Sequence, residues 1–138
     1  MKATVRICLC DDTGLRFFGE GPYRLLLGVE RLGSLRAAAQ EMNMAYTKAS
    51  ALMKHAEQVL GFPLTRRKIG GNGGGGSVLT PGAKELMERY ERYRAACREQ
   101  AERLYQECFS SFRPEEFAAD GKPGRGENHP DGCADTGL

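Results

Sequence analysis

The 138-residue sequence contains no tryptophan, only two histidines, and no run of apolar residues that approaches the length of a membrane span. A transmembrane helix needs about 18 or more such residues, so we expect no membrane partner. The first twelve residues, which end in two aspartates, also lack the apolar stretch of a signal peptide. These absences predict a cytoplasmic protein.

Few residues of the kinds that carry catalysis are present. The histidines, His55 and His129, form no Ser-His-Asp or Cys-His arrangement that is visible from spacing, so we expect no enzymatic activity. Residues 71–76 contain a formal G-x-G-x-x-G pattern. A dinucleotide-binding loop opens directly onto a helix, whereas residues 77–80 are predicted to form a strand. We therefore expect no nucleotide and no other cofactor.

The cysteines do not form a recognisable framework. Five are spread along the chain, at positions 8, 10, 97, 108 and 133, and no C-x-x-C pair occurs. An odd number at irregular spacing predicts free thiols rather than structural disulfides. Cys8 and Cys10 share one face of a predicted strand, but two thiols without a nearby histidine are weak support for a metal site. We expect no bound metal.

The net charge of +2 conceals an uneven distribution. Residues 45–68 contain five basic residues and one acidic residue, Glu57. Residues 113–138 contain three basic and six acidic residues. Such asymmetry indicates a polyanionic partner for the basic segment.

Hydrophobic periodicity and capping residues predict an α+β fold that is mainly α. Gly33 and Ser34 are suited to end one helix and begin the next, and Thr80-Pro81 is suited to begin a long helix. Residues 1–112 are predicted to be one winged helix-turn-helix domain, and residues 113–138 a disordered tail without periodicity. The expected elements are an N-terminal hairpin (strands 3–10 and 15–18), helices 22–32, 34–42 and 45–60, strands 62–69 and 77–80, and a long helix over about 81–109.

This arrangement predicts binding to double-stranded DNA. A helix fits the major groove, where exposed side chains reach base edges, and the preceding helix braces it. Helix 45–60 is the expected recognition helix, and the basic wing over residues 64–80 is expected to contact phosphates. The predicted DNA-binding residues are Ser34, Arg36, Tyr46, Thr47, Lys48, Ser50, Lys54, His55, Arg66, Arg67, Lys68, Asn72 and Ser77.

The long helix carries an apolar stripe that is longer than a small core can cover. A helix of about 28 residues extends roughly 42 Å at 1.5 Å per residue. We therefore expect a homodimer, with two recognition helices about 34 Å apart on a palindromic operator. The predicted dimerisation residues are Leu86, Tyr90, Tyr93, Cys97, Ala101, Leu104 and Cys108.

Several short segments carry a family resemblance. Residues 33–40 (GSLRAAAQ), 61–64 (GFPL) and 79–82 (LTPG) resemble the DNA-binding domain of LysR-type regulators. Residues 45–49 (AYTKA) and the glycine-rich wing 70–80 closely resemble the N-terminal domain of the ModE family of molybdate-responsive regulators. The resemblance covers roughly residues 2–110 and implies a dimeric regulator. It also implies a C-terminal molybdate-binding module. The short polar tail contains nothing that corresponds to this module, so we expect this chain to bind no molybdate.

Two other functions fit the sequence. The chain could be an interaction module that forms heterodimers with a full-length regulator and modulates it. It could also be a redox or metal sensor that uses Cys8, Cys10 and Cys133.

Overall fold

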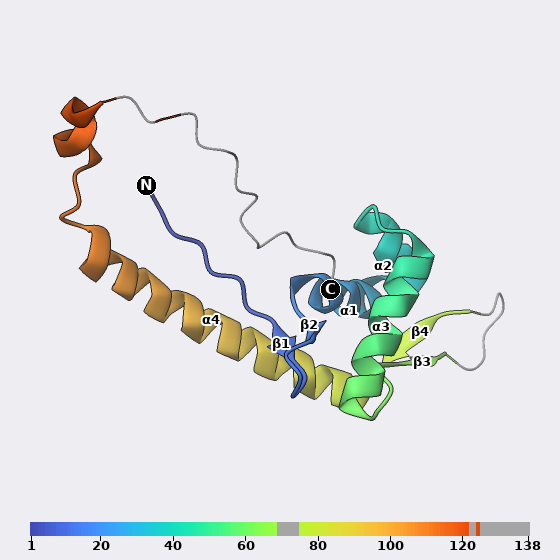
Figure 1. Ribbon diagram of the computed structural model, residues 1–138. Helices are drawn as coiled ribbons and strands as arrows, with labels where there is room; N and C mark the ends of the chain where they lie inside the picture. The colour runs from blue at the N-terminus through green and yellow to red at the C-terminus, as the bar shows by residue number, and fades with distance from the viewer. Residues whose placement is uncertain (69–74, 122–123, 125–138) are drawn as a thin grey trace.

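The computed structural model describes residues 1–68, 75–121 and 124. Three helices and a two-stranded wing gather at one end of a much longer helix (Figure 1). The winged helix-turn-helix fold is confirmed. The elements are β1 (Leu9–Cys10), β2 (Arg16–Phe18), α1 (Glu20–Leu32), α2 (Leu35–Glu41), α3 (Tyr46–Leu60), β3 (Thr65–Arg67), β4 (Ser77–Leu79), α4 (Pro81–Phe109) and the 3-10 helix η1 (Pro114–Asp120).

Short-range signals define the turns between the first three helices. Gly33 ends α1 in the left-handed conformation, with φ 75°, and its N–H donates to the Val29 carbonyl. Ser34 caps α2, since its Oγ accepts a 3.1 Å hydrogen bond from the Ala37 N–H. Asn43 has φ 53° between α2 and α3, a conformation that asparagine tolerates better than most residues. The helix-turn-helix geometry is therefore specified locally.

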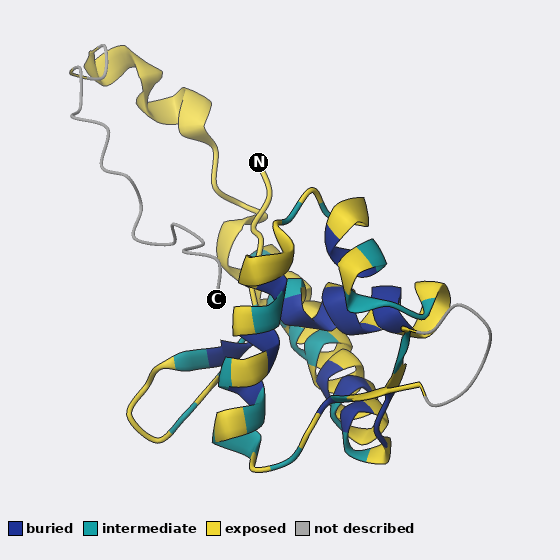
Figure 2. Ribbon diagram, turned by 90° about the vertical axis from the view of Figure 1, so that its right-hand side faces the viewer, coloured by how far each residue is buried: buried dark blue, intermediate teal, exposed yellow. Residues whose placement is uncertain are grey.

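The core lies where these helices meet the wing and the start of α4. Figure 2 shows the buried residues concentrated in this interior, with exposed residues along the outside. Small residues bring α1 and α2 close together, and a Cβ built on Gly28 would lie 2.6 Å from the Cβ of Ala38. The largest fully buried side chains are Phe18, Leu25, Leu26, Leu64, Val29 and Pro22.

The wing is an antiparallel pair in which Thr65 faces Leu79 and Arg67 faces Ser77. It is held to the rest of the domain at two points. The Ser77 N–H donates a 2.7 Å hydrogen bond to the Gly33 carbonyl, in the turn between α1 and α2. The Thr80 hydroxyl donates to the Pro63 carbonyl at 2.7 Å. The wing is thus anchored to α1 and to the start of α4.

The N-terminal strand is shorter than predicted. Only Leu9–Cys10 pairs with β2, and the register shifts between these two residues. The preceding residues approach α4 instead: the Tyr90 hydroxyl donates to the Ile7 carbonyl at 2.8 Å, and the Tyr105 hydroxyl donates to the Met1 carbonyl at 2.6 Å. The alternating pattern over residues 3–10 predicted a longer strand than the one that forms, because the partner strand β2 is only three residues long.

Helix α4 packs on the domain only through its first part (Figure 1). Ala83, Met87 and Tyr90 are buried, and Arg94 pairs with Glu20 across the α1–α4 contact. Beyond this point the helix projects away from the core. Residues 114–120, expected to be disordered, form a 3-10 helix with no buried residue; most of the remaining tail lies outside the described residues. Among the helices that the structure describes, none is both long and apolar enough to span a bilayer.

Candidate nucleic-acid interface

The outer surface of α3 is polar over its first turns. Thr47, Lys48 and Lys54 are exposed, and Ser50 is half-buried. The opposite face is buried through Ala49, Leu52, Met53 and Ala56. The predicted recognition residues therefore lie on the side of α3 that faces away from the core, where a groove surface can reach them.

The start of α2 lies beside the start of α3. The Arg36 guanidinium carbon sits 4.4 Å from the centre of the Tyr46 ring. Both residues are exposed. Ser34, also predicted to bind DNA, already uses its hydroxyl oxygen to cap α2. Its position in the structure is that of a helix cap next to the interface.

The wing supplies the remaining predicted contacts. Arg66, Arg67 and Lys68 are exposed along and just after β3. Ser77 is half-buried, and its N–H ties the loop-side end of β4 to the Gly33 carbonyl. A Cβ built on Gly76 would lie 2.9 Å from the Gly33 carbonyl oxygen, so the chain passes too close for a larger residue. Asn72 lies outside the described residues.

The positive charge of this surface is not compensated within the described chain. Basic residues elsewhere form ion pairs, as Arg89 does with Glu85 and Arg103 with Glu99. No ion pair between described residues involves any of the predicted interface cations, which are Arg36, Lys48, Lys54, Arg66, Arg67 and Lys68. Uncompensated cations on one surface are the electrostatic signature of a polyanion-binding site.

The one acidic residue within 45–68 is turned away from this surface. Glu57 is half-buried, and its carboxylate accepts a 2.7 Å hydrogen bond from the Leu64 N–H. This bond joins α3 to the segment that leads into β3. Spacing alone could not predict it, because the contact depends on how the turn after α3 folds back.

His55 faces the N-terminal hairpin rather than open solvent. Its Nε2 lies 3.2 Å from the Arg16 carbonyl oxygen, which accepts the bond, and the side chain is half-buried. At the tip of this hairpin, hydrogen bonds from the Thr13 side chain and the Leu15 N–H lower the pKa of Asp11, and His55 contributes to the same shift. His55 thus has a structural contact that the sequence did not predict.

One cation near the wing, Lys84, was not predicted to belong to the site. Lys84, in the first part of α4, lines a hollow of about 250 Å³ together with Lys68 and Ser77. It was missed because it lies on a helix that was assigned wholly to dimerisation. Its spacing of four residues from the Thr80 cap is the only sequence signal that places it near the wing.

The predicted dimerisation stripe divides into two parts. Tyr90 is buried in its own domain, where its ring lies 5.1 Å from those of Phe18 and Tyr23, so the single chain already packs this residue. Tyr93 and Leu104 are each 57% exposed, and Cys108 is exposed as well. Leu86, Cys97 and Ala101 are half-buried.

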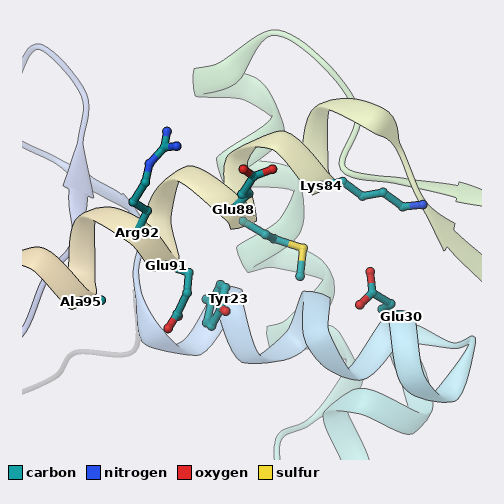
Figure 3. A pocket seen from close by; sticks show the side chains of 8 residues that line it. Tyr23, Glu30, Lys84, Glu88, Glu91, Arg92 and Ala95 are labelled. Carbon is teal, nitrogen blue, oxygen red and sulfur yellow. The ribbon is translucent and has the colours of Figure 1, made fainter.

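Other features of the described residues lie outside this surface. The groove between α1 and α4 is lined by Tyr23 and Met87, with Glu30, Lys84 and Glu88 among the charges around it (Figure 3). No group of three or more potential metal ligands occurs among the described residues. Partial desolvation and the neighbouring Cys8 thiol raise the pKa of the Cys10 thiol, which lowers its thiolate fraction.

Residues 23–84 match the family model described as bacterial regulatory helix-turn-helix protein, lysR family. The chain is 36% identical over 80 residues to the molybdenum-pterin-binding protein MopB of Rhodobacter capsulatus, covering 58% of this chain and 29% of that protein. It is 32% identical over 68 residues to the transcriptional regulator ModE of Haemophilus influenzae, covering 49% of this chain and 27% of that protein.

The chain thus spans less than a third of the length of these relatives. A solved structure of the CbnR DNA-binding domain with DNA aligns with a TM-score of 0.48 at 20% identity, covering 60% of this chain and 90% of that one. The matched segment contains α2, α3 and the wing. Residues 23–84 thus match the helix-turn-helix of the lysR family of bacterial regulators, and part of the chain is similar to the MopB and ModE proteins.

Proposed function

We propose that this chain is a sequence-specific DNA-binding transcriptional regulator that acts by occupying a promoter. Helix α3 enters the major groove, where Thr47, Lys48, Ser50 and Lys54 reach base edges. The observation that carries the proposal is the set of interface cations that have no carboxylate partner among the described residues. Within this set, Arg66, Arg67 and Lys68 of the wing contact phosphates and provide affinity for any duplex.

The experiment that tests the proposal is fluorescence anisotropy of a labelled random duplex, measured against salt concentration. Log affinity should fall linearly with log salt, with a slope of about −0.9 for each neutralised phosphate. The triple variant Arg66→Ala, Arg67→Ala, Lys68→Ala should flatten this slope by up to about 3. Its matched control removes three arginines from α4, Arg89, Arg92 and Arg103, and should leave the slope unchanged.

A second measurement separates base reading from phosphate contact. Thr47→Ala and Lys48→Ala should reduce discrimination between a selected operator and random DNA, whereas the wing variant should weaken both equally. If the wing and α3 variants behaved alike, the assignment of separate roles would be wrong. If the wild type did not bind DNA at low salt, the chain would instead fit an interaction module that pairs with a longer regulator.

We also propose that the chain acts as a homodimer on a palindromic operator. Tyr93 and Leu104 are exposed on the part of α4 that projects from the core, and apolar surface on a projecting helix is favourably buried against a second copy. Light scattering should give twice the chain mass for the wild type and the monomer mass for Tyr93→Glu, Leu104→Glu. The matched control, Glu99→Gln, Glu102→Gln, should keep the mass of the wild type.

A further inference from the structure

The contact between Arg36 and Tyr46 links the two helices of the helix-turn-helix at the proposed groove surface. The guanidinium carbon is 4.4 Å from the ring centre, which is a cation–π distance. Arg36 has no ion pair with a described carboxylate, whereas Arg31, in the last turn of α1, is paired with Glu41. The ring is therefore the partner that the structure gives to Arg36.

Both side chains project from backbone that is fixed by local hydrogen bonds. The Ser34 cap holds the first turn of α2, which carries Arg36. After α2 the Met44 N–H donates a 2.8 Å hydrogen bond to the Ala39 carbonyl, which sets the position where α3 begins. Tyr46 is the first residue of α3. The pair thus projects from helices, which hold binding side chains more precisely than loops do.

The Arg36 guanidinium lies over the Tyr46 ring, and Tyr46 is still 42% exposed, so part of the residue can contact another partner. In the major groove the group that an apolar ring edge distinguishes is the 5-methyl group of thymine, which aromatic side chains contact. A neighbouring planar guanidinium limits the rotation of the ring and so holds this edge in place.

We propose that Tyr46 determines specificity for a thymine through contact between its ring and the thymine methyl group, and that Arg36 is the positioning residue for that ring. This rests on the proposed function. It also gives a specific role to Arg36, which the sequence predicted only as one of the DNA-binding residues. The prediction is that two exposed residues on different helices act as one recognition unit.

The test uses an operator selected from a random library with the wild-type protein, in which each thymine is replaced in turn by uracil. The loss of one methyl contact should weaken wild-type binding about fourfold at one position in each half-site. Tyr46→Phe, which keeps the ring, should retain this thymine-to-uracil ratio. Tyr46→Ala should reduce the ratio to one, and circular dichroism would check that this exposed substitution leaves the fold intact.

Arg36→Lys distinguishes positioning from charge. It keeps the positive charge but lacks the planar guanidinium, so the salt slope should be unchanged while the thymine-to-uracil ratio falls. In Arg36→Lys, Tyr46→Ala the ratio should equal that of Tyr46→Ala alone.

Three results would overturn the inference. The first is that Tyr46→Ala abolishes the thymine-to-uracil ratio at no operator position. The others are loss of this ratio in Tyr46→Phe and an unchanged ratio in Arg36→Lys. Each of these leaves the salt-dependent binding of the random duplex intact. Failure of the inference and failure of the proposed function are therefore distinguishable.

Discussion

Helices α1 and α2 approach closely where Gly28 meets Ala38, and this contact allows a quantitative test. A Cβ added at Gly28 would lie 2.6 Å from the Cβ of Ala38 and 3.1 Å from its Cα. Carbon atoms pack optimally at about 3.5–4.0 Å, so α1 and α2 must separate by roughly 1 Å to accept Gly28→Ala. Ala38 is 1% exposed and has no side-chain rotation that could relieve the contact.

Two opposing effects set the magnitude. Replacing glycine by alanine inside a helix stabilises it by up to about 1 kcal/mol. Overpacking a close-packed interior costs about 1–3 kcal/mol. Because the clash here involves a fixed methyl group and backbone, the second effect should exceed the first. We expect Gly28→Ala to lower the free energy of unfolding by about 1–2 kcal/mol.

Urea denaturation followed by far-UV circular dichroism would measure this change. The matched control is Gly21→Ala, in the first turn of the same helix, where an added Cβ meets nothing within 4 Å. The double variant Gly28→Ala, Ala38→Gly moves the methyl group across the contact, and its cost should be about 1 kcal/mol below the sum of the single changes. A Gly28→Ala protein as stable as Gly21→Ala would refute the argument.

Three other changes test the anchoring contacts. Thr80→Val removes the hydroxyl that donates to the Pro63 carbonyl and caps α4, so urea denaturation should show a loss of about 1–3 kcal/mol, largely restored in Thr80→Ser. The hydrogen bond from the Thr13 hydroxyl is the main cause that lowers the pKa of Asp11. The ionised carboxylate therefore stabilises the fold above its unfolded pKa, and this stabilisation is lost as the pH falls through the folded pKa. Asp11→Asn should lose less stability than the wild type between about pH 5 and pH 2. Tyr90→Phe removes the hydrogen bond to the N-terminal segment, and hydrogen exchange there should become faster while the dimer mass stays unchanged. A slower exchange, or a monomer, would contradict that last expectation.

The helices could be predicted because their signals are local. Gly33, Ser34 and Thr80 each act on backbone groups within about one turn, and the structure places them at helix ends. The helix predicted from residue 22 begins at Glu20 instead, so Pro22 lies in its first turn. Proline is tolerated there, since the N–H groups of a first turn need no helical partner.

Contacts between distant segments were not predictable in the same way. Tyr90 follows the same spacing as Leu104, yet one is buried and the other is 57% exposed. Periodicity identifies the apolar face of a helix, but it does not show where along the helix the domain ends. His55 likewise has the exposed-face spacing of a recognition residue, and only the fold brings the Arg16 carbonyl to its ring.

The turn between α1 and α2 connects the two parts of the proposed interface. Gly33 ends α1, its carbonyl accepts the N–H of Ser77 in the wing strand β4, and the next residue caps α2. The wing cations and the Arg36–Tyr46 pair are therefore positioned from neighbouring residues of one rigid turn. A displacement of this turn would move phosphate contacts and base contacts together, even though no residue in it needs to touch DNA. A Cβ added at Gly76 would lie 2.9 Å from the Gly33 carbonyl oxygen. Gly76 therefore matters for affinity through the geometry of this turn rather than through charge.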